Sequence, residues 1–211
     1  MGSGKEGADG VIIDLEDAVP IGEKETARVF AGDSIHLIKA EGVDVFVRVN
    51  SLATGLTAED IKAVVCEGLD GIMLPKAESK EEIIQLDKLI GREEEEKGLE
   101  TFTLSIIPTL ETAKGVLNAY EIATSSKRII ALSFGAADFL RDLGRSYATM
   151  SADEMELLYA RSQISIAARA AGVLAIDTPF LGLVIDEEGL IQESKMALQL
   201  GFKGKMVIHP A

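Results

Sequence analysis

The sequence predicts a parallel α/β fold, and three observations support this prediction. Seven short apolar runs recur along the chain, and their first residues lie roughly 26 to 45 positions apart, the length of a strand plus a return helix. Most runs are apolar at consecutive positions, which is typical of strands covered on both faces. Segments with helical periodicity separate the runs, and such alternation of strand and helix indicates a parallel sheet.

The predicted strands share this apolar character and end at polar or turn residues. They cover residues 11–15, 45–50, 71–75, 103–111, 129–135, 174–180 and 205–210. Four gaps between strands contain a Ser, Thr or Asp at a predicted helix start, namely Thr57, Ser79, Ser151 and Asp186. Ser79 with Glu82, and Ser151 with Glu154, have the spacing of capping boxes. The glutamate-rich run 92–97 predicts a solvated helix face or loop.

Composition bounds the class of protein. The chain has 211 residues, 47% hydrophobic and 27% charged, as expected for a globular domain. A net charge of −14 argues against nucleic acid as a partner. The single cysteine, Cys66, is predicted to be a helix core residue, and the absence of a disulfide pair fits a reducing compartment. No apolar run is long enough to span a bilayer, so we expect a soluble cytoplasmic protein that has no membrane partner.

Polar residues at strand ends distinguish two architectures. An open dinucleotide-binding sheet should show a glycine-rich turn after its first strand, and none follows residues 11–15. Functional groups that converge from many strand ends are typical of a barrel mouth. Such residues lie at or just after the C-terminal ends of the predicted strands: Asp14, Glu16, Arg48, Asn50, Lys76, Glu111, Asp138, Asp177 and His209. We therefore predict a single (β/α)8 TIM-barrel catalytic domain over residues 1–211, with its first strand missing because only seven are visible.

Glu111 and Asp138 form the sharpest candidate pair. Glu111 ends one predicted strand and Asp138 follows the next, so their carboxylates should face the same barrel mouth. Two carboxylates without a His or Cys partner suit Mg²⁺ or Mn²⁺, which bind oxygen and retain several waters. The same spacing also fits two helix caps, one for each following helix, so both interpretations stand. With two histidines, His36 and His209, the chain cannot form a His-rich zinc site.

Arg48 lies in an otherwise apolar strand, where an unpaired charge would be costly to bury. Its planar guanidinium suits a carboxylate or a thioester oxygen. The alternative is a structural ion pair with the acidic cluster of Asp14, Glu16 and Asp17. Lys76, at another strand end, shows no sign of a Schiff-base role, so we interpret it as a solvated or ion-paired lysine.

Seven motifs in order along the chain resemble one family. They are VIIDLEDAVP, VFVRVNS, GIMLPK, IPTLET, SFGAADFLRDLG, ARAAGVLAIDTPF and GKMVIHPA. Together they resemble the citrate lyase β-subunit group of the HpcH/HpaI aldolase superfamily. The resemblance implies a TIM barrel that uses Mg²⁺ to cleave or form a carbon–carbon bond beside an acyl thioester. Such barrels are usually homotrimers or hexamers, and some are part of a larger lyase complex.

The resemblance also implies roles for individual residues. Glu111 and Asp138 would bind Mg²⁺, with Mn²⁺ as a possible substitute. Arg48 and Glu111 would bind the substrate, and Arg48 would stabilise the developing enolate. Glu16 and Asp17 would accept hydrogen bonds from metal-bound waters or pair with Arg48, which would offset their mutual repulsion.

The implied reaction is a retro-Claisen cleavage of a 3-hydroxy-3-carboxyacyl thioester of the citryl, malyl or citramalyl type. Its products are a 2-oxo acid and an acetyl thioester carried by coenzyme A or an acyl carrier protein. Two alternatives are a class II pyruvate aldolase of the same superfamily and a non-catalytic barrel subunit that binds oxo acid or thioester.

Two features of the family are missing from these residues. One is a first strand with a Pro-Gly loop, and the other is a segment after the last strand that supplies an acidic residue in several relatives. We therefore expect a natural protein that is longer at both ends. Its additional strand should pair between the strands at 11–15 and 205–210.

Overall fold

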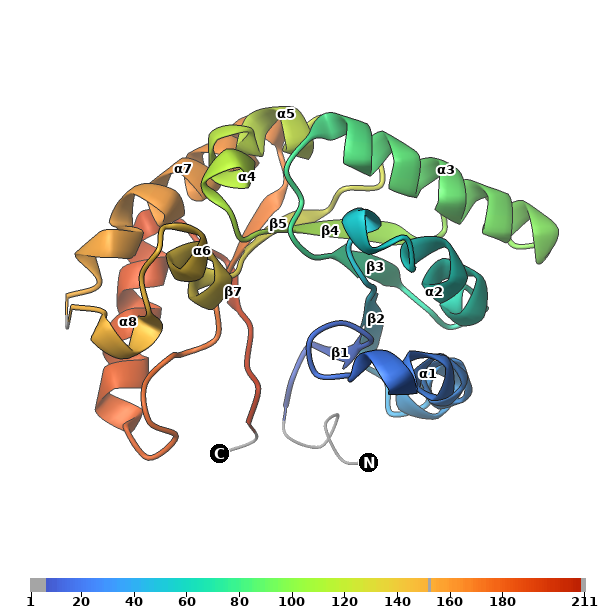
Figure 1. Cartoon of the computed structure of the whole chain (residues 1–211), viewed down its shortest axis with the longest axis horizontal. Helices are drawn as coiled ribbons and strands as arrows, with labels where there is room; N and C mark the ends of the chain where they lie inside the picture. The colour runs from blue at the N-terminus through green and yellow to red at the C-terminus, as the bar shows by residue number, and fades with distance from the viewer. Residues whose placement is uncertain (1–6, 152, 210–211) are drawn as a thin grey trace. The chain divides into compact units, whose positions relative to one another are not determined.

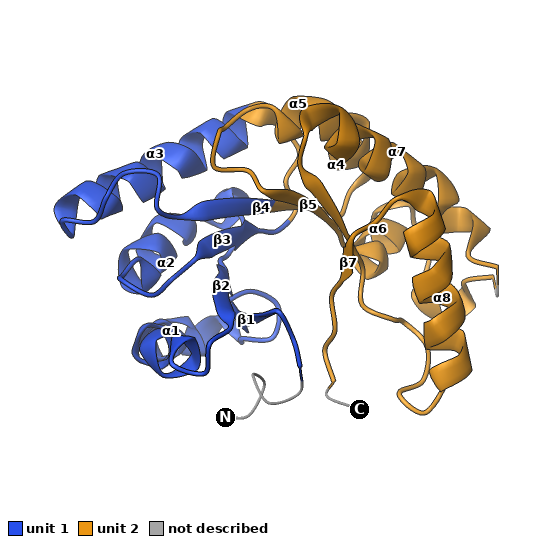
Figure 2. Ribbon diagram, turned by 180° about the vertical axis from the view of Figure 1, so that it is seen from behind, with its two compact units in different colours: residues 1–75, 81–107 blue, residues 76–80, 108–211 orange. Residues whose placement is uncertain are grey.

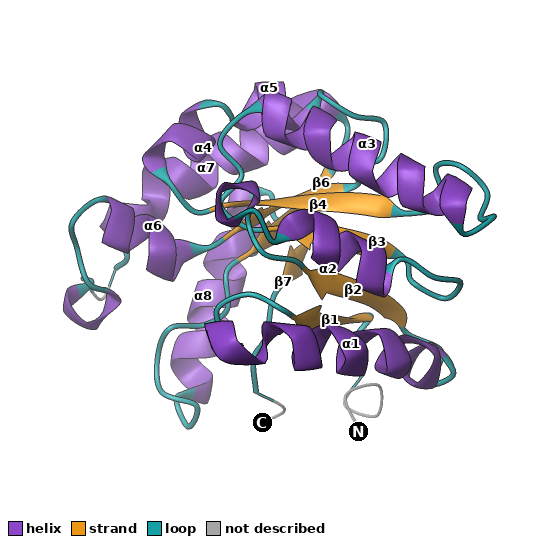
Figure 3. Cartoon of the chain, turned by 45° about the vertical axis from the view of Figure 1, so that its right-hand side comes forward, coloured by secondary structure: helices purple, strands orange, loops and turns teal. Residues whose placement is uncertain are grey.

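The computed structural model describes residues 7–151 and 153–209 (Figure 1). Strands and helices alternate, and the assigned strand pairs are parallel, which confirms the parallel α/β prediction. Strand order follows chain order, and each strand up to β6 is followed by at least one helix before the next strand (Figure 3). The chain divides into two compact units, residues 1–75 with 81–107, and residues 76–80 with 108–211 (Figure 2).

The strands overlap the predicted apolar runs. They are β1 (Gly10–Asp14), β2 (Asp44–Arg48), β3 (Gly71–Leu74), β4 (Ser105–Leu110), β5 (Ala131–Phe134), β6 (Leu174–Asp177) and β7 (Gly204–Lys205). The prediction for 205–210 is wrong in extent. Met206 N–H still donates to the Asp177 carbonyl, but β6 ends there, so the next residues lack this pairing partner. Val207 and Ile208 are accordingly exposed, and residue 210 lies outside the described residues.

The helices lie in the predicted gaps. They are α1 (Lys24–Lys39), α2 (Thr57–Val64), α3 (Lys80–Glu96), α4 (Ala113–Leu117), α5 (Ala119–Ala123), α6 (Ala136–Asp142), α7 (Met155–Ala171) and α8 (Glu187–Leu200). Asp186 caps α8 as predicted, because its side chain accepts a hydrogen bond from Gly189 N–H. Within the described residues, no helix is long and apolar enough to cross a membrane.

The first unit is built on β1, β2 and β3. Its core includes Val45 and Val47 of β2 with Ile72 of β3, all fully buried. The β1–β2 register pairs Asp14 with Arg48, so the two charged residues end neighbouring strands side by side. Burial of these apolar side chains therefore helps to fix where the strand-end charges stand.

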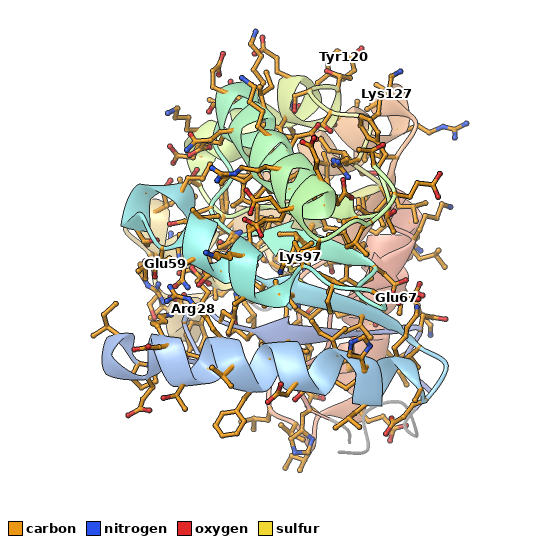
Figure 4. All side chains as sticks on the ribbon, turned by 90° about the vertical axis from the view of Figure 1, so that its right-hand side faces the viewer. Arg28, Glu59, Glu67, Lys97, Tyr120 and Lys127 are labelled. Atoms are coloured by element: carbon orange, nitrogen blue, oxygen red, sulfur yellow. The ribbon has the colours of Figure 1, made fainter. Side chains whose placement is uncertain are left out.

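A buried carboxylate ties α1 and α2 to the end of β2. Asp60 of α2 is fully buried and accepts a 2.7 Å hydrogen bond from Arg28 Nε of α1. Arg28 Nη1 also lies 2.8 Å from Glu59 (Figure 4). The other Asp60 oxygen accepts from the backbone N–H and the side-chain amide of Asn50, at 2.8 and 2.7 Å. One carboxylate thus satisfies donors from a helix and from the residues after a strand.

Two predictions for polar residues of the first unit need correction. The run 92–97 is solvated at Arg92, Glu95 and Glu96, but the Glu94 carboxylate is buried and accepts from the N–H groups of Phe102 and Leu104, which lead into β4. Cys66 is not in a helix core, because α2 ends at Val64. Cys66 is half-buried in the following turn, and burial raises the pKa of its thiol although Lys97 opposes the shift.

The second unit carries a buried ionic cluster that joins α7, α8, β6 and β7. Arg161 is 1% exposed, and its Nε lies 3.0 Å from Asp177 Oδ1. It also pairs with Glu154 and, at 3.2 Å, with Glu193. Lys205 Nζ lies 3.0 Å from Asp177 Oδ2 and contacts Glu193 as well. Two cations therefore face three carboxylates, and one negative charge is left over when all are ionised.

The same cluster explains why the predicted capping box at Ser151 and Glu154 does not form. Glu154 has a left-handed backbone with φ of 51° and its carboxylate is committed to Arg161. Ser151 Oγ donates instead to Glu156, and α7 begins at Met155.

Glu193 is the carboxyl group whose pKa responds to this surplus negative charge. Burial, opposed by Lys205 and reinforced by repulsion from Glu154, raises its pKa to about 7. Because an unfolded glutamate has a pKa of about 4.3, the folded state holds the proton more tightly. The stability that this proton contributes is therefore fully present below about pH 4 and is lost as the pH rises to about 7.

Glu193→Gln should remove this dependence, because the amide keeps the shape of the side chain but does not titrate. We expect the wild-type free energy of unfolding to fall between pH 5 and pH 8 more steeply than that of the variant, measured by urea unfolding. Glu188→Gln, at an exposed position of α8, is the control and should follow the wild type. Equal slopes for wild type and Glu193→Gln would contradict this account.

Candidate active site

Glu111 and Asp138 line one cavity in the second unit, as expected from their strand-end positions. The cavity has a volume of about 230 Å³. Its lining residues come from the segment after β3, the end of β4 and helix α6, namely Lys76, Glu111, Thr112, Asp138, Arg141 and Asp142. The structure therefore brings the two predicted metal ligands together.

The capping interpretation of these carboxylates is wrong. The N-cap of α4 is Thr112, whose side chain accepts a 3.1 Å hydrogen bond from Gly115 N–H. The N-cap of α6 is Gly135, and Asp138 lies inside the first turn of that helix. Because neither carboxylate occupies a cap position, both can serve the cavity that they line.

The Glu111 carboxylate is buried and held from two sides. Glu111 is 3% exposed, and its Oε2 accepts a 2.9 Å hydrogen bond from the backbone N–H of Lys76. On the other side lies Gly135: a Cβ at that position would come within 2.5 Å of both Cγ and Oε1 of Glu111. The missing side chain of Gly135 thus provides the space in which the carboxylate sits.

Lys76 delivers its N–H from a left-handed backbone conformation with φ of 52°, which is unfavourable for a residue with a side chain. The next residues are clamped against α4 and β4. Ala77 N–H donates to the Thr109 carbonyl at 3.1 Å, and Asn118 Nδ2 donates to the Glu78 carbonyl at 2.8 Å. These contacts hold the strained residue in place, so that its amide points at Glu111.

Asp138 and Asp142 lie one turn apart on α6. Asp138 is 19% exposed in its side chain and forms an ion pair with Arg141. Asp142 Oδ2 accepts a 2.8 Å hydrogen bond from the N–H of Ala113, the first residue of α4. The cavity wall is therefore fixed by backbone donors at Glu111 and Asp142, and by a side-chain cation at Asp138.

This donor set fits a hard divalent cation. Mg²⁺ is commonly bound by one or two carboxylates and completes its shell with water and substrate oxygens. Among the described residues, no group of three or more His, Cys, Asp or Glu side chains is arranged to hold a metal ion. A pair of carboxylates on one cavity matches the Mg²⁺ pattern and not that of a closed structural zinc site.

Arg48 forms the ion pair that was the alternative to a substrate role, and it lies in the first unit. Its Nε and Nη2 donate to the two Asp14 oxygens at 2.8 and 2.6 Å, and Nη1 lies 3.2 Å from Glu16 Oε2. Burial alone would raise the pKa of Asp14, but hydrogen bonds from Arg48 and from Glu16 N–H outweigh it and hold the pKa below its ordinary value. Glu16 is buried, whereas Asp17 is exposed on the following turn.

A larger depression lies elsewhere in the first unit. Its volume is about 680 Å³, and it is lined mainly by α1, with Cys66 and Lys97 on the opposite wall. His36 of α1 is one of its lining residues. Lys97 is committed to the carbonyls of Lys62 and Val65 at the end of α2, so this cation serves as a helix cap.

Four features of the candidate site were not predicted. The Lys76 amide, the space at Gly135, the Arg141 ion pair and the Asp142 contact all depend on which elements become neighbours. The motif SFGAADFLRDLG, which contains Gly135, was visible in the sequence. Arg141 and Asp142 follow Asp138 by three and four residues, and in a helix this spacing would have placed them on the same face as Asp138. The left-handed conformation of Lys76 has no comparable signal.

The chain is similar to proteins of known type. The family model described as HpcH/HpaI aldolase/citrate lyase matches residues 3–210. The chain is 41% identical over 204 residues to citrate lyase subunit beta of Leuconostoc mesenteroides subsp. cremoris, covering 97% of this chain and 66% of that protein. It is 34% identical over 217 residues to the mitochondrial citramalyl-CoA lyase of Homo sapiens, covering 96% and 61%.

A solved structure of the same kind is similar in fold. It is the citrate lyase beta subunit of M. tuberculosis complexed with oxaloacetate and magnesium, with a TM-score of 0.78 at 34% identity, covering 96% of this chain and 82% of that one. The present chain spans about two thirds of the length of the curated relatives that it matches. On the match over residues 3–210, the chain belongs to the HpcH/HpaI aldolase/citrate lyase family.

Proposed function

We propose that the whole protein is a Mg²⁺-dependent carbon–carbon lyase. Its substrate is a 3-hydroxy-3-carboxyacyl thioester of the citryl, malyl or citramalyl type, and its products are a 2-oxo acid and an acetyl thioester. The observation that carries this proposal is the cavity shared by Glu111 and Asp138. The similarity to a citrate lyase subunit and a citramalyl-CoA lyase, and to a structure that contains oxaloacetate and magnesium, supports the same chemistry.

In this proposal Glu111 and Asp138 hold the cation, and Mn²⁺ can replace Mg²⁺. When bound, the ion acts as a Lewis acid toward oxygens that gain charge during cleavage. Lys76 N–H and the space at Gly135 keep the Glu111 carboxylate in position. A ligand that is already oriented lowers the reorganisation needed when metal and substrate arrive.

Arg48 is proposed to bind the substrate carboxylate and to stabilise the developing enolate. Its guanidinium is planar and permanently charged, which suits two parallel hydrogen bonds to a carboxylate. Asp14 holds Nε and Nη2, and therefore orients the plane of the guanidinium. Glu16 and Asp17 are proposed to act beside Arg48 and toward metal-bound water, without direct contact to the ion.

The remaining proposals concern architecture and setting. The parallel strands in chain order and the TM-score of 0.78 support a (β/α)8 barrel that forms a single domain. Assembly into a homotrimer or hexamer, or into a larger lyase complex, is a prediction from the resemblance. So are a cytoplasmic location and the use of coenzyme A or an acyl carrier protein as the acyl carrier.

A lyase is favoured over a class II pyruvate aldolase. Such aldolases need a base near the metal, commonly a histidine. No histidine is among the described residues that line the cavity. A panel of citryl, malyl and citramalyl thioesters with and without Mg²⁺ tests the proposal by release of 2-oxo acid. Metal-dependent release supports a lyase, whereas binding of oxo acid without cleavage of any thioester favours a non-catalytic subunit.

Gly135→Ala should weaken metal binding without unfolding the protein. The new Cβ would displace the Glu111 carboxylate, whose side chain can move more easily than backbone. Changing the groups that position a metal ligand typically costs about 10- to 100-fold in metal affinity. We expect this loss for Mn²⁺ by electron paramagnetic resonance, with a thermal midpoint within about 4 °C of the wild type.

Gly204→Ala is the matched control in the same unit. A Cβ there meets only ordinary contacts, at 3.7 and 3.8 Å from Ile176, so Mn²⁺ affinity should stay at the wild-type value. Wild-type affinity in Gly135→Ala would show that the Glu111 carboxylate is not a ligand in the position described.

Arg48→Lys should lower kcat/KM by about 10- to 100-fold, because an ammonium group cannot reproduce a bidentate hydrogen bond to a carboxylate. The assay is the thioester cleavage above, performed with the full chain. Arg92→Lys is the control, since Arg92 is 72% exposed and pairs with Glu96 on the same helix. Near-normal turnover in Arg48→Lys would leave Arg48 as a structural ion pair with Asp14.

A further inference from the structure

Arg141 forms an ion pair with Asp138, which is one of the two proposed metal ligands. It lies one helical turn after Asp138 on α6, and its Nη1 donates to Asp138 Oδ1. Both residues line the 230 Å³ cavity together with Glu111. A carboxylate that is proposed to bind a divalent cation is thus already neutralised by a side chain of the same helix.

Charged residues of both signs line the cavity. The described lining residues include three carboxylates, Glu111, Asp138 and Asp142, and two cations, Lys76 and Arg141. Glu111 accepts from a backbone N–H, and so does Asp142, without a net positive charge from these donors. Asp138 accepts from the guanidinium of Arg141, which carries a full positive charge.

Exposure indicates which member of the pair can move. The Arg141 side chain is 72% exposed, whereas that of Asp138 is 19% exposed. Exposed ion pairs are weak, because water solvates the charges and a long side chain loses rotamer freedom when it is held. Arg141 can therefore leave for solvent at small cost, while Asp138 stays on the cavity wall.

We propose that Arg141 is the internal counter-ion of the metal site. It pairs with Asp138 when no metal is bound and moves to solvent when a divalent cation binds, because two positive charges on one carboxylate oxygen repel each other. Arg141 is thus a positioning residue that competes with the metal and sets its affinity. This inference rests on the proposed function, since it requires Asp138 to be a metal ligand.

The test is Mn²⁺ affinity in wild type, Arg141→Gln and Arg145→Gln, measured by electron paramagnetic resonance. Loss of an exposed competing pair should tighten binding by about two- to fivefold in Arg141→Gln. Arg145→Gln removes the same charge four residues later, but Arg145 pairs with Glu156 and does not line the cavity. This control reports the effect of net charge alone and should change affinity less.

Nitrogen-15 NMR of the arginine Nε–H groups follows the movement directly. Saturating Mg²⁺ should shift the Arg141 signal and leave the Arg145 signal in place. Arg141→Lys, which keeps the positive charge, should bind Mn²⁺ with near wild-type affinity. Thermal midpoints without metal check that each variant is folded.

The outcomes separate the two proposals. If the wild type and Arg141→Gln both fail to bind Mn²⁺, the proposed metal site is wrong and the inference falls with it. If both bind, but Arg141→Gln is no tighter than Arg145→Gln or the Arg141 signal ignores Mg²⁺, only the counter-ion role is overturned.

Discussion

The buried carboxylate of Glu111 is the constraint on which the candidate site depends. Removing an ionised carboxylate from water costs several kcal/mol unless other groups replace the lost hydration. Here the Lys76 N–H provides one hydrogen bond, and the clamp of residues 77 and 78 on β4 and α4 keeps that donor in place. The short helix α4 is therefore part of the site, although none of its own residues lines the cavity.

The charged clusters of the two units follow different principles. Asp14 and Glu16 carry their own permanent cation in Arg48, and this compensation is local to two neighbouring strand ends. In the cluster around Arg161, by contrast, three carboxylates share two cations under almost complete burial. The first arrangement lowers the pKa of a carboxyl group and the second raises one. The balance of charge, and not burial alone, decides the direction.

The sequence allowed the strands, most helices and the pair Glu111 and Asp138 to be predicted, because apolar periodicity and strand-end position are local properties. Local pattern could not show which neighbour satisfies each polar group. Glu94 looked solvated, yet it accepts from the backbone that leads into β4. The strand at 205–210 looked long, yet β7 is only as long as β6 allows it to be. The role of Arg48 toward a substrate stays a prediction, since its contacts to Asp14 and Glu16 describe the protein alone.

The backbone of Lys76 restricts which residues this position tolerates. A left-handed conformation costs about 1 kcal/mol for a residue with a Cβ and more for a β-branched one. Glycine or asparagine would supply the same amide at lower cost, but neither would bring a positive charge to the cavity. Lys76 therefore provides both the backbone N–H that donates to Glu111 and a positively charged side chain at the cavity. With φ of 52°, this position disfavours valine, isoleucine and threonine by their shape, and proline by its fixed φ and missing N–H.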